Sequence, residues 1–268
     1  MLAKPIRILF FGDVVGKIGR RAVTAILPQW QKKYKPDLVI ANVENLAHGK
    51  GVTERTLQEL KSAGINIFTG GNHIWSKDDP SSEAIQANYV LALPANDPQT
   101  PVTHRWQTIP VGEQELYLLS MLGQFQMEGE NIRNPFHEFD ELYETMEKPK
   151  LLLVDFHAEA TSEKVAFGLY LDGRASAVLG THTHVPTADG RILPGQTGYL
   201  SDLGMVGGLN TVLGVKAEII INRFKQSGIT SFDWPDDGPA EINACVLELD
   251  PTTGHCLRLE PIHATITI

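Results

Sequence analysis

Apolar residues fall into short runs that alternate with amphipathic stretches over most of the chain. The runs that predict buried strands cover residues 6–11, 38–43, 65–68, 116–122, 151–155, 177–179 and 197–201. Between the first two runs, residues 23–34 carry apolar side chains at helical spacing, although Pro28 should kink this helix or restart it. Strands that alternate with helices in this way predict an α/β fold.

Further helices are marked by their spacing and by their end residues. Thr53 is a suitable N-cap for a helix that Gly64 ends. Residues 138–146 and 162–171 are also expected to be helical. The pattern therefore continues well beyond the first strands.

Two regions depart from the alternation. Residues 80–112 are rich in Pro, Asn and Thr, and apart from the apolar run 89–93 they predict a long irregular excursion. Near the C-terminus, residues 244–249 and 256–262 predict a hairpin. Because no repeat, low-complexity tract or Ser/Gly linker interrupts the sequence, we expect a single domain over residues 1–268.

Composition excludes several classes of protein. The 268 residues are 42% hydrophobic and 21% charged, which is typical of globular proteins and excludes wholesale disorder. No apolar run approaches the roughly 20 residues that span a bilayer, so we expect no membrane association. The net charge of −9 repels polyanions, which argues against a protein that coats DNA irrespective of sequence.

The expected location is the cytoplasm. Residues 1–5 show no apolar h-region and no small-residue cleavage site of a signal peptide. Cys245 and Cys256 lack metal-ligand spacing and are interpreted as buried thiols in a reducing compartment. A disulfide across the C-terminal hairpin is the alternative.

Polar residues cluster where the predicted strands end. The clusters are Gly12-Asp13, Glu44-Asn45, Gly71-Asn72-His73, Asp155-Phe156-His157 and Gly180-Thr181-His182-Thr183-His184. In open α/β sheets, ligands bind beyond the carboxyl ends of the strands, because the loops of neighbouring strands meet there. Asp13 and Glu44 are separated by about one βαβ unit, so they can lie on adjacent parallel strands. We therefore expect these clusters to converge on one site.

The residue types in these clusters suit two metal ions. The expected ligands are three imidazoles, two carboxylates and two amides, namely His157, His182, His184, Asp13, Glu44, Asn45 and Asn72. Mixed nitrogen and oxygen ligands favour Fe, Mn or Zn over Ca or Mg. Seven donors are too many for one tetrahedral ion, so we expect two ions that share Glu44 as a bridge, with water in the open positions.

A site of this charge suits an anionic phosphoester. Two divalent ions with the carboxylates of Asp13 and Glu44 and one bridging hydroxide leave a single positive charge. Paired metals can clamp a phosphoryl group and lower the pKa of the water between them, so the bridging hydroxide is the expected nucleophile. His73 follows a predicted ligand and is expected to protonate the leaving oxygen as a general acid, because histidine titrates near neutrality.

Structural roles compete with these assignments. Asn45 and Asn72 could be turn residues, Asp13 could cap the helix that follows it, and His73 could only brace a ligand. The histidine ligands could instead be hydrogen-bonded loop residues. Trp75 and Phe125 could stack a nucleobase, although aromatic residues more often belong to a core.

Several of these motifs resemble a known family. Gly70-Gly71-Asn72-His73 and Gly180-Thr181-His182-Thr183-His184 are similar to the GNH and GHxH blocks of calcineurin-type metallophosphoesterases. Where that superfamily has Asp-x-His and Gly-Asp-x-x-Asp, this chain has Asp13-Val14-Val15 and Val43-Glu44-Asn45. These departures are typical of the YmdB-like branch. The sequence also resembles that branch over residues 12–16, 41–45, 155–164 and 170–174.

The resemblance implies a fold, an activity and a ligand set. The fold would be a four-layer α/β sandwich, with two central mixed β-sheets flanked by helices. The activity would be hydrolysis of 2′,3′-cyclic nucleotides at a di-metal centre that is often di-iron. One metal would be held by Asp13, Glu44, Asn45 and His184, and the other by Glu44, Asn72, His157 and His182, with His73 as proton donor. His48 stands where the family has a small residue, which changes the expected shape of the substrate rim.

Other functions and partners stay open at this point. The same metals would serve a phosphomonoesterase or an RNA-processing nuclease, which would differ at a rim expected at residues 80–112 and 124–137. A regulatory nucleotide-binding protein with a retained metal site is the non-enzyme alternative. The expected partners are a small phosphodiester or nucleotide substrate, RNA ends as a further candidate, and copies of the chain itself in a homo-oligomer.

Overall fold

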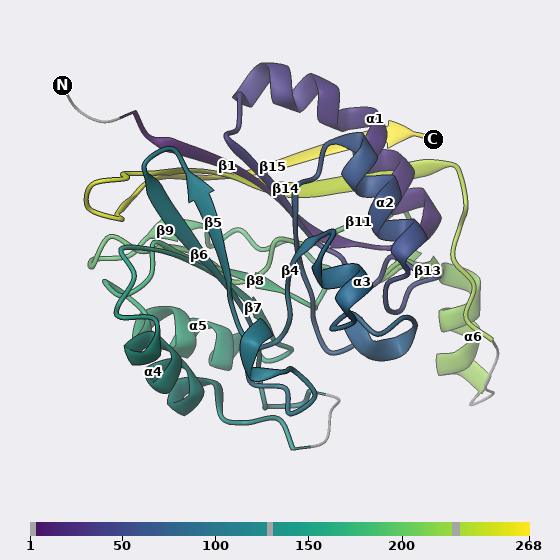
Figure 1. Cartoon of the computed structure of the whole chain (residues 1–268). Helices are drawn as coiled ribbons and strands as arrows, with labels where there is room; N and C mark the ends of the chain where they lie inside the picture. Colours follow the sequence, from purple (N-terminus) through teal and green to yellow (C-terminus); the bar gives the residue numbers. More distant parts are fainter. Residues whose placement is uncertain (1–3, 128–130, 227–230) are drawn as a thin grey trace.

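Two β-sheets lie face to face in the middle of the molecule, and helices cover both outer faces (Figure 1). The computed structural model describes residues 4–127, 131–226 and 231–268. Four layers result, helix, sheet, sheet and helix, and both sheets contain parallel and antiparallel pairs. The predicted four-layer α/β sandwich is therefore confirmed.

The first sheet has seven strands. In order across the sheet they are β15 (Cys256–Thr267), β14 (Pro239–Leu249), β11 (Met205–Gly208), β1 (Ile6–Val14), β2 (Leu38–Asn42), β3 (Ile67–Thr69) and β4 (Val90–Ala92). The strands from β11 to β4 run parallel, whereas β14 and β15 form the expected C-terminal hairpin. The carboxyl ends of β1, β2 and β3 therefore lie at the same edge.

The second sheet has six strands. In order they are β5 (Gln107–Val111), β6 (Gln114–Leu122), β7 (Leu151–His157), β8 (Ala177–Thr181), β10 (Gly198–Leu200) and β9 (Arg191–Ile192). The central strands β6, β7, β8 and β10 are parallel, and β5 and β9 are antiparallel edges. A separate two-stranded ribbon joins β12 (Thr211–Val212) to β13 (Val215–Lys216) and leads into α6 (Ala217–Gln226).

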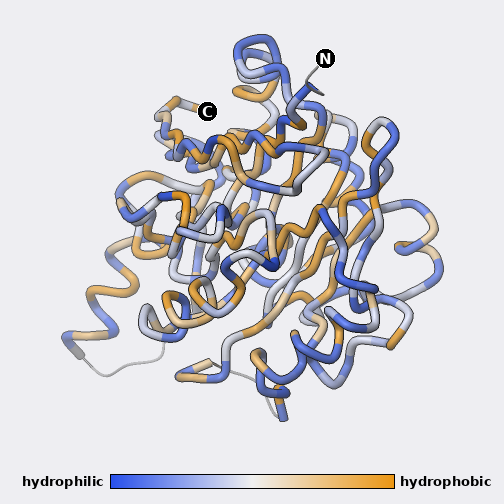
Figure 2. Tube along the Cα trace, turned by 90° about the vertical axis from the view of Figure 1, so that its left-hand side faces the viewer, coloured by the Kyte–Doolittle hydropathy of each residue, from blue (hydrophilic) through white to orange (hydrophobic). Residues whose placement is uncertain are grey.

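Three hydrophobic cores correspond to the three interfaces between layers. On β1, Leu9 and Phe11 pack toward α1 (Gly16–Tyr34) and α2 (Glu54–Ala63), whereas Ile8 and Phe10 face the second sheet. A third core joins the second sheet to α4 (Pro135–Thr145) and α5 (Thr161–Tyr170). The alternation arises because successive side chains of a strand point to opposite faces. Figure 2 shows apolar residues along the strands in the middle of the molecule.

The first helix is longer than its apolar spacing predicts. It begins at Gly16 and continues without interruption through Pro28, so the expected restart is wrong. Pro28 removes one backbone hydrogen bond, but buried residues on both sides of it, including Val23 and Trp30, pack against the first sheet and hold the helix together. Val15 and not Asp13 occupies the N-cap, which excludes the capping role for Asp13.

Residues 80–112 are more regular than expected. They contain α3 (Glu83–Gln86), β4 and β5, together with a 3₁₀ turn over Val102–His104; a further 3₁₀ turn covers Ile74–Ser76. The strand β5 was not predicted, because this edge strand alternates exposed and buried residues only weakly. Its regularity comes from pairing with β6, which composition does not reveal.

Both cysteines are free and buried, so the disulfide alternative is excluded. In the hairpin, Cys245 lies opposite Pro261 and Cys256 lies opposite Leu249. Burial raises the pKa of both thiols, which makes them inert at neutral pH. Among the described residues, no helix is long and apolar enough to cross a bilayer.

Candidate metal centre

The seven predicted ligands come from the carboxyl ends of strands in both sheets. From the first sheet, Asp13 lies on β1, Glu44 and Asn45 follow β2, and Asn72 follows β3. From the second sheet, His157 ends β7, and His182 and His184 follow β8. The structure brings these side chains into two adjoining groups at the junction of the sheets.

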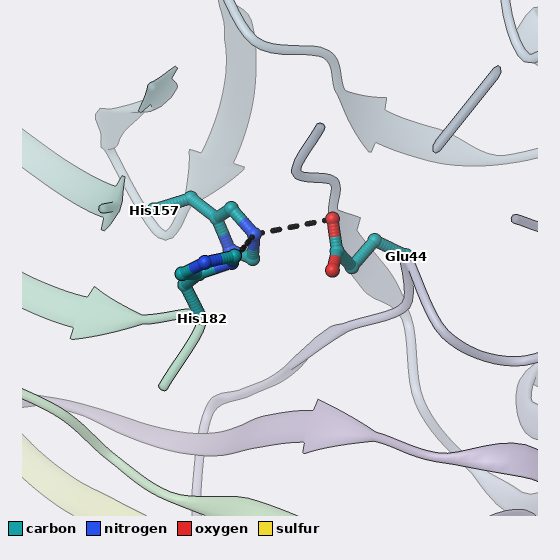
Figure 3. A group of neighbouring side chains, drawn as sticks. All are labelled: Glu44, His157 and His182. Atoms are coloured by element: carbon teal, nitrogen blue, oxygen red, sulfur yellow. Dashed lines mark hydrogen bonds and ion pairs between the residues drawn. The ribbon is translucent and has the colours of Figure 1, made fainter. Parts of the chain in front are cut away.

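The first group surrounds Nε2 of His157. This atom lies 3.1 Å from Oε2 of Glu44, 3.1 Å from Oδ1 of Asn72 and 3.1 Å from Nδ1 of His182. Figure 3 shows Glu44, His157 and His182 directed toward one another from different elements, and their ligand atoms all lie within 4.8 Å. Four donor atoms that converge in this way are spaced for one shared cation.

The second group surrounds Nε2 of His184. This atom lies 3.3 Å from Oδ1 of Asn45 and 3.9 Å from Oδ1 of Asp13. Oδ1 of Asp13 is buried and accepts no hydrogen bond from any residue that the structure describes, although Oδ2 accepts one from the backbone of His182. A buried carboxylate oxygen without a donor is unfavourable, and a cation would satisfy it. The donor set therefore fits metal ions.

Local backbone geometry makes this approach possible. A Cβ atom at Gly71 would lie 2.2 Å from Oε2 of Glu44 and 2.4 Å from Nε2 of His157, so only glycine lets the loop after β3 pass this close. His182 and His184 adopt left-handed backbone conformations, with φ of 99° and 65°. Non-glycine residues rarely adopt such conformations, and they persist where the surroundings enforce them.

Each imidazole directs one nitrogen toward a polar partner outside the group and the other nitrogen inward. Nδ1 of His184 faces the carbonyl of Leu213 at 3.1 Å, which can only accept. Nε2 of His182 lies 3.1 Å from a carboxylate oxygen of Glu159. Such outward bonds fix the tautomer and orient a histidine toward a metal.

The third imidazole is oriented through Thr181. Nδ1 of His157 lies 2.8 Å from the Thr181 hydroxyl, which donates its own proton to Oδ1 of Asp155 at 2.6 Å. The Thr181 oxygen therefore accepts from Nδ1, and Nε2 is left to face Glu44. Asp155 is buried, and its other oxygen accepts from Asn42 and Thr69 of the first sheet at 2.9 and 2.5 Å.

A buried ion pair supports the loop that carries His182 and His184. Nζ of Lys164 on α5 donates to Oδ2 of Asp202 at 2.5 Å and to the carbonyl of Thr181 at 2.7 Å. The same carboxylate accepts from the backbone and the hydroxyl of Thr183, between the two histidines. This anchor keeps the left-handed turns in place.

The charges of the group act on one another. Burial alone would lower the pKa of His157, but Glu44, followed by Asp13 and Asp155, raises it to about 9. Burial opposes ionisation of Glu44, yet the neighbouring His157 and His73 hold its pKa well below the usual range. Without a metal, His157 and Glu44 therefore form a buried ion pair.

The other imidazoles are held neutral. Burial, followed by the charge of His157, lowers the pKa of His182 to about 3. Burial also lowers the pKa of His184. At Asp13, burial outweighs the attraction of His157 and raises the pKa well above its usual value. Neutral imidazoles are the form in which histidine binds a metal.

His73 lies at the mouth of the site. Its backbone N–H donates to Oε2 of Glu44 at 3.0 Å, and its Nδ1 lies 3.3 Å from Oε1 of the same carboxylate and 3.5 Å from the Asn45 amide. The ring also lines a cavity of about 250 Å³ that opens from the donors. His73 therefore lies beside the donors and lines the same space, where a substrate would lie.

The rim of this cavity differs from the expectation. The remaining lining comes from Val15, Gly49, Lys50, Glu159, Thr183, Leu213, Val215, Phe232 and Trp234, beside Glu44, Asn45, His182 and His184. The described parts of segments 80–112 and 124–137 do not line this cavity, contrary to the expectation for them, and residues 128–130 lie outside the described residues. His48 adopts φ of 55° and lines a neighbouring cavity.

Neither aromatic residue that the sequence suggested for base stacking lines the cavity. Trp75 packs against the first core, and its indole N–H donates to Asp97 at 3.1 Å. Phe125 is 61% exposed. The aromatic side chains at the rim are instead Phe232 and Trp234.

Several functional residues escaped sequence reasoning. Thr181, Glu159 and Asp202 orient the imidazoles, yet their residue types are common in loops, and only their contacts reveal the role. Glu159 and Thr181 did lie inside the quoted motif blocks, two and one residues from predicted ligands. Trp234 lies outside all of the motifs that the sequence indicated.

The comparisons with known proteins cover almost the whole chain. The family described as "YmdB-like protein" matches residues 9–262. A Bacillus subtilis (strain 168) protein named 2′,3′-cyclic-nucleotide 2′-phosphodiesterase is 41% identical over 257 residues, which are 96% of each chain.

Two solved structures are similar throughout. A structure titled as a novel phosphatase from Mycoplasma pneumoniae has a TM-score of 0.91 at 35% identity and covers 99% of this chain and 95% of its own. A hypothetical protein from Thermus thermophilus has a TM-score of 0.87 at 38% identity, covering 97% of this chain and 99% of its own. Sequence and fold therefore agree over the same span.

Proposed function

The chain belongs to the YmdB-like protein family, and from this premise we propose that it is a metal-dependent phosphodiesterase acting on 2′,3′-cyclic nucleotides. The substrate class is supported by the Bacillus subtilis relative, whose name specifies that activity at 41% identity. The observation that carries the metal dependence is the pair of donor groups around His157 and His184, with a buried Asp13 oxygen that lacks a donor.

Two ions would be held by the two groups. One would bind Asp13, Asn45 and His184, the other Asn72, His157 and His182, and Glu44 would serve both. Mixed nitrogen and oxygen ligation favours Fe, Mn or Zn. When bound, such ions polarise the phosphoryl oxygens and supply an activated water as nucleophile.

The residues of the chain orient the substrate around this centre. Neutral His182 and His184 add no charge, so the carboxylates of Asp13 and Glu44 only partly offset two divalent ions, and the site attracts a phosphodiester monoanion. The strands β1, β2 and β7, which are buried where they lead into the donors, keep the donors in place. The cavity opens on the side of His73 and Trp234, where the nucleoside would lie.

His73 would move the proton that hydrolysis requires. Its ring lies at the cavity and is braced by Glu44, so a leaving ribose oxygen bound in the cavity comes within reach. A positioned histidine that protonates the leaving oxygen contributes about 10²–10⁴-fold to the rate. Its distance of 3.3 Å from Glu44 also permits a metal-holding role, and the two roles predict different variants.

A phosphomonoesterase is the second candidate, because the Mycoplasma pneumoniae structure is titled a phosphatase. The test is a parallel assay of the metal-loaded protein with 2′,3′-cAMP, a linear dinucleotide and a nucleoside monophosphate. Turnover of 2′,3′-cAMP well above the other two supports the proposal. Turnover of the monophosphate alone contradicts it.

A further inference from the structure

Beside the donor groups, one aromatic ring has no part in any of the three cores. Trp234 follows α6 in the chain and precedes β14, and its side chain is half-buried. The ring lines the cavity of about 250 Å³ that contains Glu44, His73 and His184. It also lines an adjoining cavity of about 940 Å³, so it separates two open spaces beside the proposed metal centre.

The backbone around this ring is shaped to receive it. Gly49 has φ of 78°, and a Cβ atom there would lie 2.1 Å from Cε2 of the Trp234 indole. No side chain other than hydrogen fits between them. Gly49 also accepts a hydrogen bond from the Asn45 side chain at 3.0 Å, so the turn that receives the ring also holds a predicted ligand. The indole is therefore positioned relative to the donors by one short segment.

A neighbouring aromatic ring packs against Trp234. Phe232 meets Trp234 at 61°, with ring centroids 6.2 Å apart, in an edge contact. The guanidinium of Arg223 lies over the Phe232 ring, 5.4 Å from its centroid, and Phe232 is 40% exposed. Both rings line the cavity, and Trp234 is the one that lies against the turn holding the predicted ligand Asn45.

From these contacts we propose that Trp234 forms a nucleobase subsite, a flat platform on which the base of the substrate stacks while its phosphate lies at the donor groups. This inference rests on the proposed function and adds to it the residue that distinguishes a nucleotide from other cyclic phosphodiesters. Stacking suits all four bases, because each has a π face. The subsite would therefore select for a base without selecting strongly among bases.

The test compares a nucleotide with a substrate that lacks a base. The substrates are 2′,3′-cAMP and glycerol 1,2-cyclic phosphate, which share the five-membered cyclic phosphodiester. The measured quantity is the ratio of their kcat/KM values in the wild type, Trp234→Leu and Trp234→Phe. Leucine keeps an apolar side chain but removes the π face, whereas phenylalanine keeps a smaller one.

We expect Trp234→Leu to lower this ratio by about 5- to 150-fold, the range for one base stacked on an aromatic side chain, through a higher KM for 2′,3′-cAMP. Trp234→Phe should retain most of the wild-type ratio. Phe125→Leu, at an exposed aromatic residue away from the cavity, serves as the matched control and should leave the ratio unchanged. An unchanged ratio in Trp234→Leu, or equal losses on both substrates, overturns the proposal.

A binding measurement separates this inference from the proposed function. If the wild type hydrolyses neither substrate, the proposed function fails, and titration with adenosine 3′-monophosphate still tests the platform. Quenching of tryptophan fluorescence in the wild type that is lost in Trp234→Phe supports stacking on this ring. Equal quenching in both proteins, or none in either, overturns it.

Discussion

Asp155 and His157 lie on the same face of β7, and their side chains are joined through Thr181 of the neighbouring strand. The Thr181 hydroxyl donates to Asp155 at 2.6 Å and accepts from Nδ1 of His157 at 2.8 Å. The carboxylate thus sets the tautomer of an imidazole that it does not touch. The same carboxylate accepts from Asn42 and Thr69, so it also links the two sheets beneath the donor groups.

Thr181→Val tests this connection with almost no change of volume. The variant lacks the hydroxyl that orients His157, and loss of such an orienting group costs about 10–100-fold in metal affinity or activity. Metal affinity is measured by competition with a chelator. Thr24→Val, which removes an exposed hydroxyl on α1, is the control and should bind as the wild type does. Equal affinity in Thr181→Val would show that His157 needs no such orientation.

Glu44→Gln replaces the carboxylate that is proposed to bind both metal ions with a neutral amide. Because Glu44 is the proposed bridge between the two metal ions, we expect lower metal content and hydrolysis reduced by several orders of magnitude, as determined by elemental analysis and assay of 2′,3′-cAMP. Glu144→Gln, an exposed substitution on α4, is the control. Cellular effects that persist in the Glu44→Gln strain would instead favour a regulatory binding role.

His73→Asn separates a proton donor from a ligand. If His73 donates the proton, the variant keeps its metal content while kcat falls by about 10²–10⁴-fold. Elemental analysis and steady-state kinetics on the same preparation provide both values. Loss of metal together with activity would assign His73 to the ligand set.

Metal binding should strengthen as the pH rises. The raised pKa of His157, about 9, means that its imidazole is protonated at neutral pH in the metal-free protein, and a metal must displace that proton. The apparent affinity should therefore increase about tenfold per pH unit from roughly pH 7 to near pH 9, then level off. Calorimetry in buffers of different ionisation enthalpy counts the proton released. Affinity that is flat over this range contradicts the ion pair of His157 with Glu44.

The Lys164–Asp202 pair should matter for stability as well as for the loop. Lys164→Met leaves a buried carboxylate without its cation, and breaking such a pair costs about 3–5 kcal/mol of unfolding free energy. Urea denaturation measures the change. The double variant Lys164→Met/Asp202→Asn should lose less than the sum of the single losses, because no buried charge remains unpaired. Additive losses would show that the two side chains are not coupled.

Much of the architecture could be predicted because most buried strands carry an apolar run of their own and each predicted ligand cluster lies at the end of one. The strands β1, β2, β3, β7 and β8 were predicted, although β1, β7 and β8 continue two or three residues beyond their predicted ends, and the convergence of their side chains follows from the parallel arrangement. The position of Asp13 beside His184 depends on sheet order, which local sequence does not encode.

The C-terminal third of the chain shows why other parts could not be predicted. The strand β11 reads Met-Val-Gly-Gly, which has little strand propensity and is regular only because β1 and β14 flank it. The helix α6 carries apolar residues at helical spacing, but Ile221 and Phe224 of that face are exposed, so no buried core accounts for the helix. The position of Trp234 at the rim depends on the close approach of its indole to Gly49, a contact between distant segments that local sequence does not encode.

The predicted ligands come from both sheets, and this division would affect more than catalysis. An ion held by Glu44, which follows a strand of one sheet, and by His157 of the other sheet would cross-link the two sheets. Without the metal, the two sheets would be held together less tightly. The lifetime of the protein in a cell would then depend on the supply of its metal.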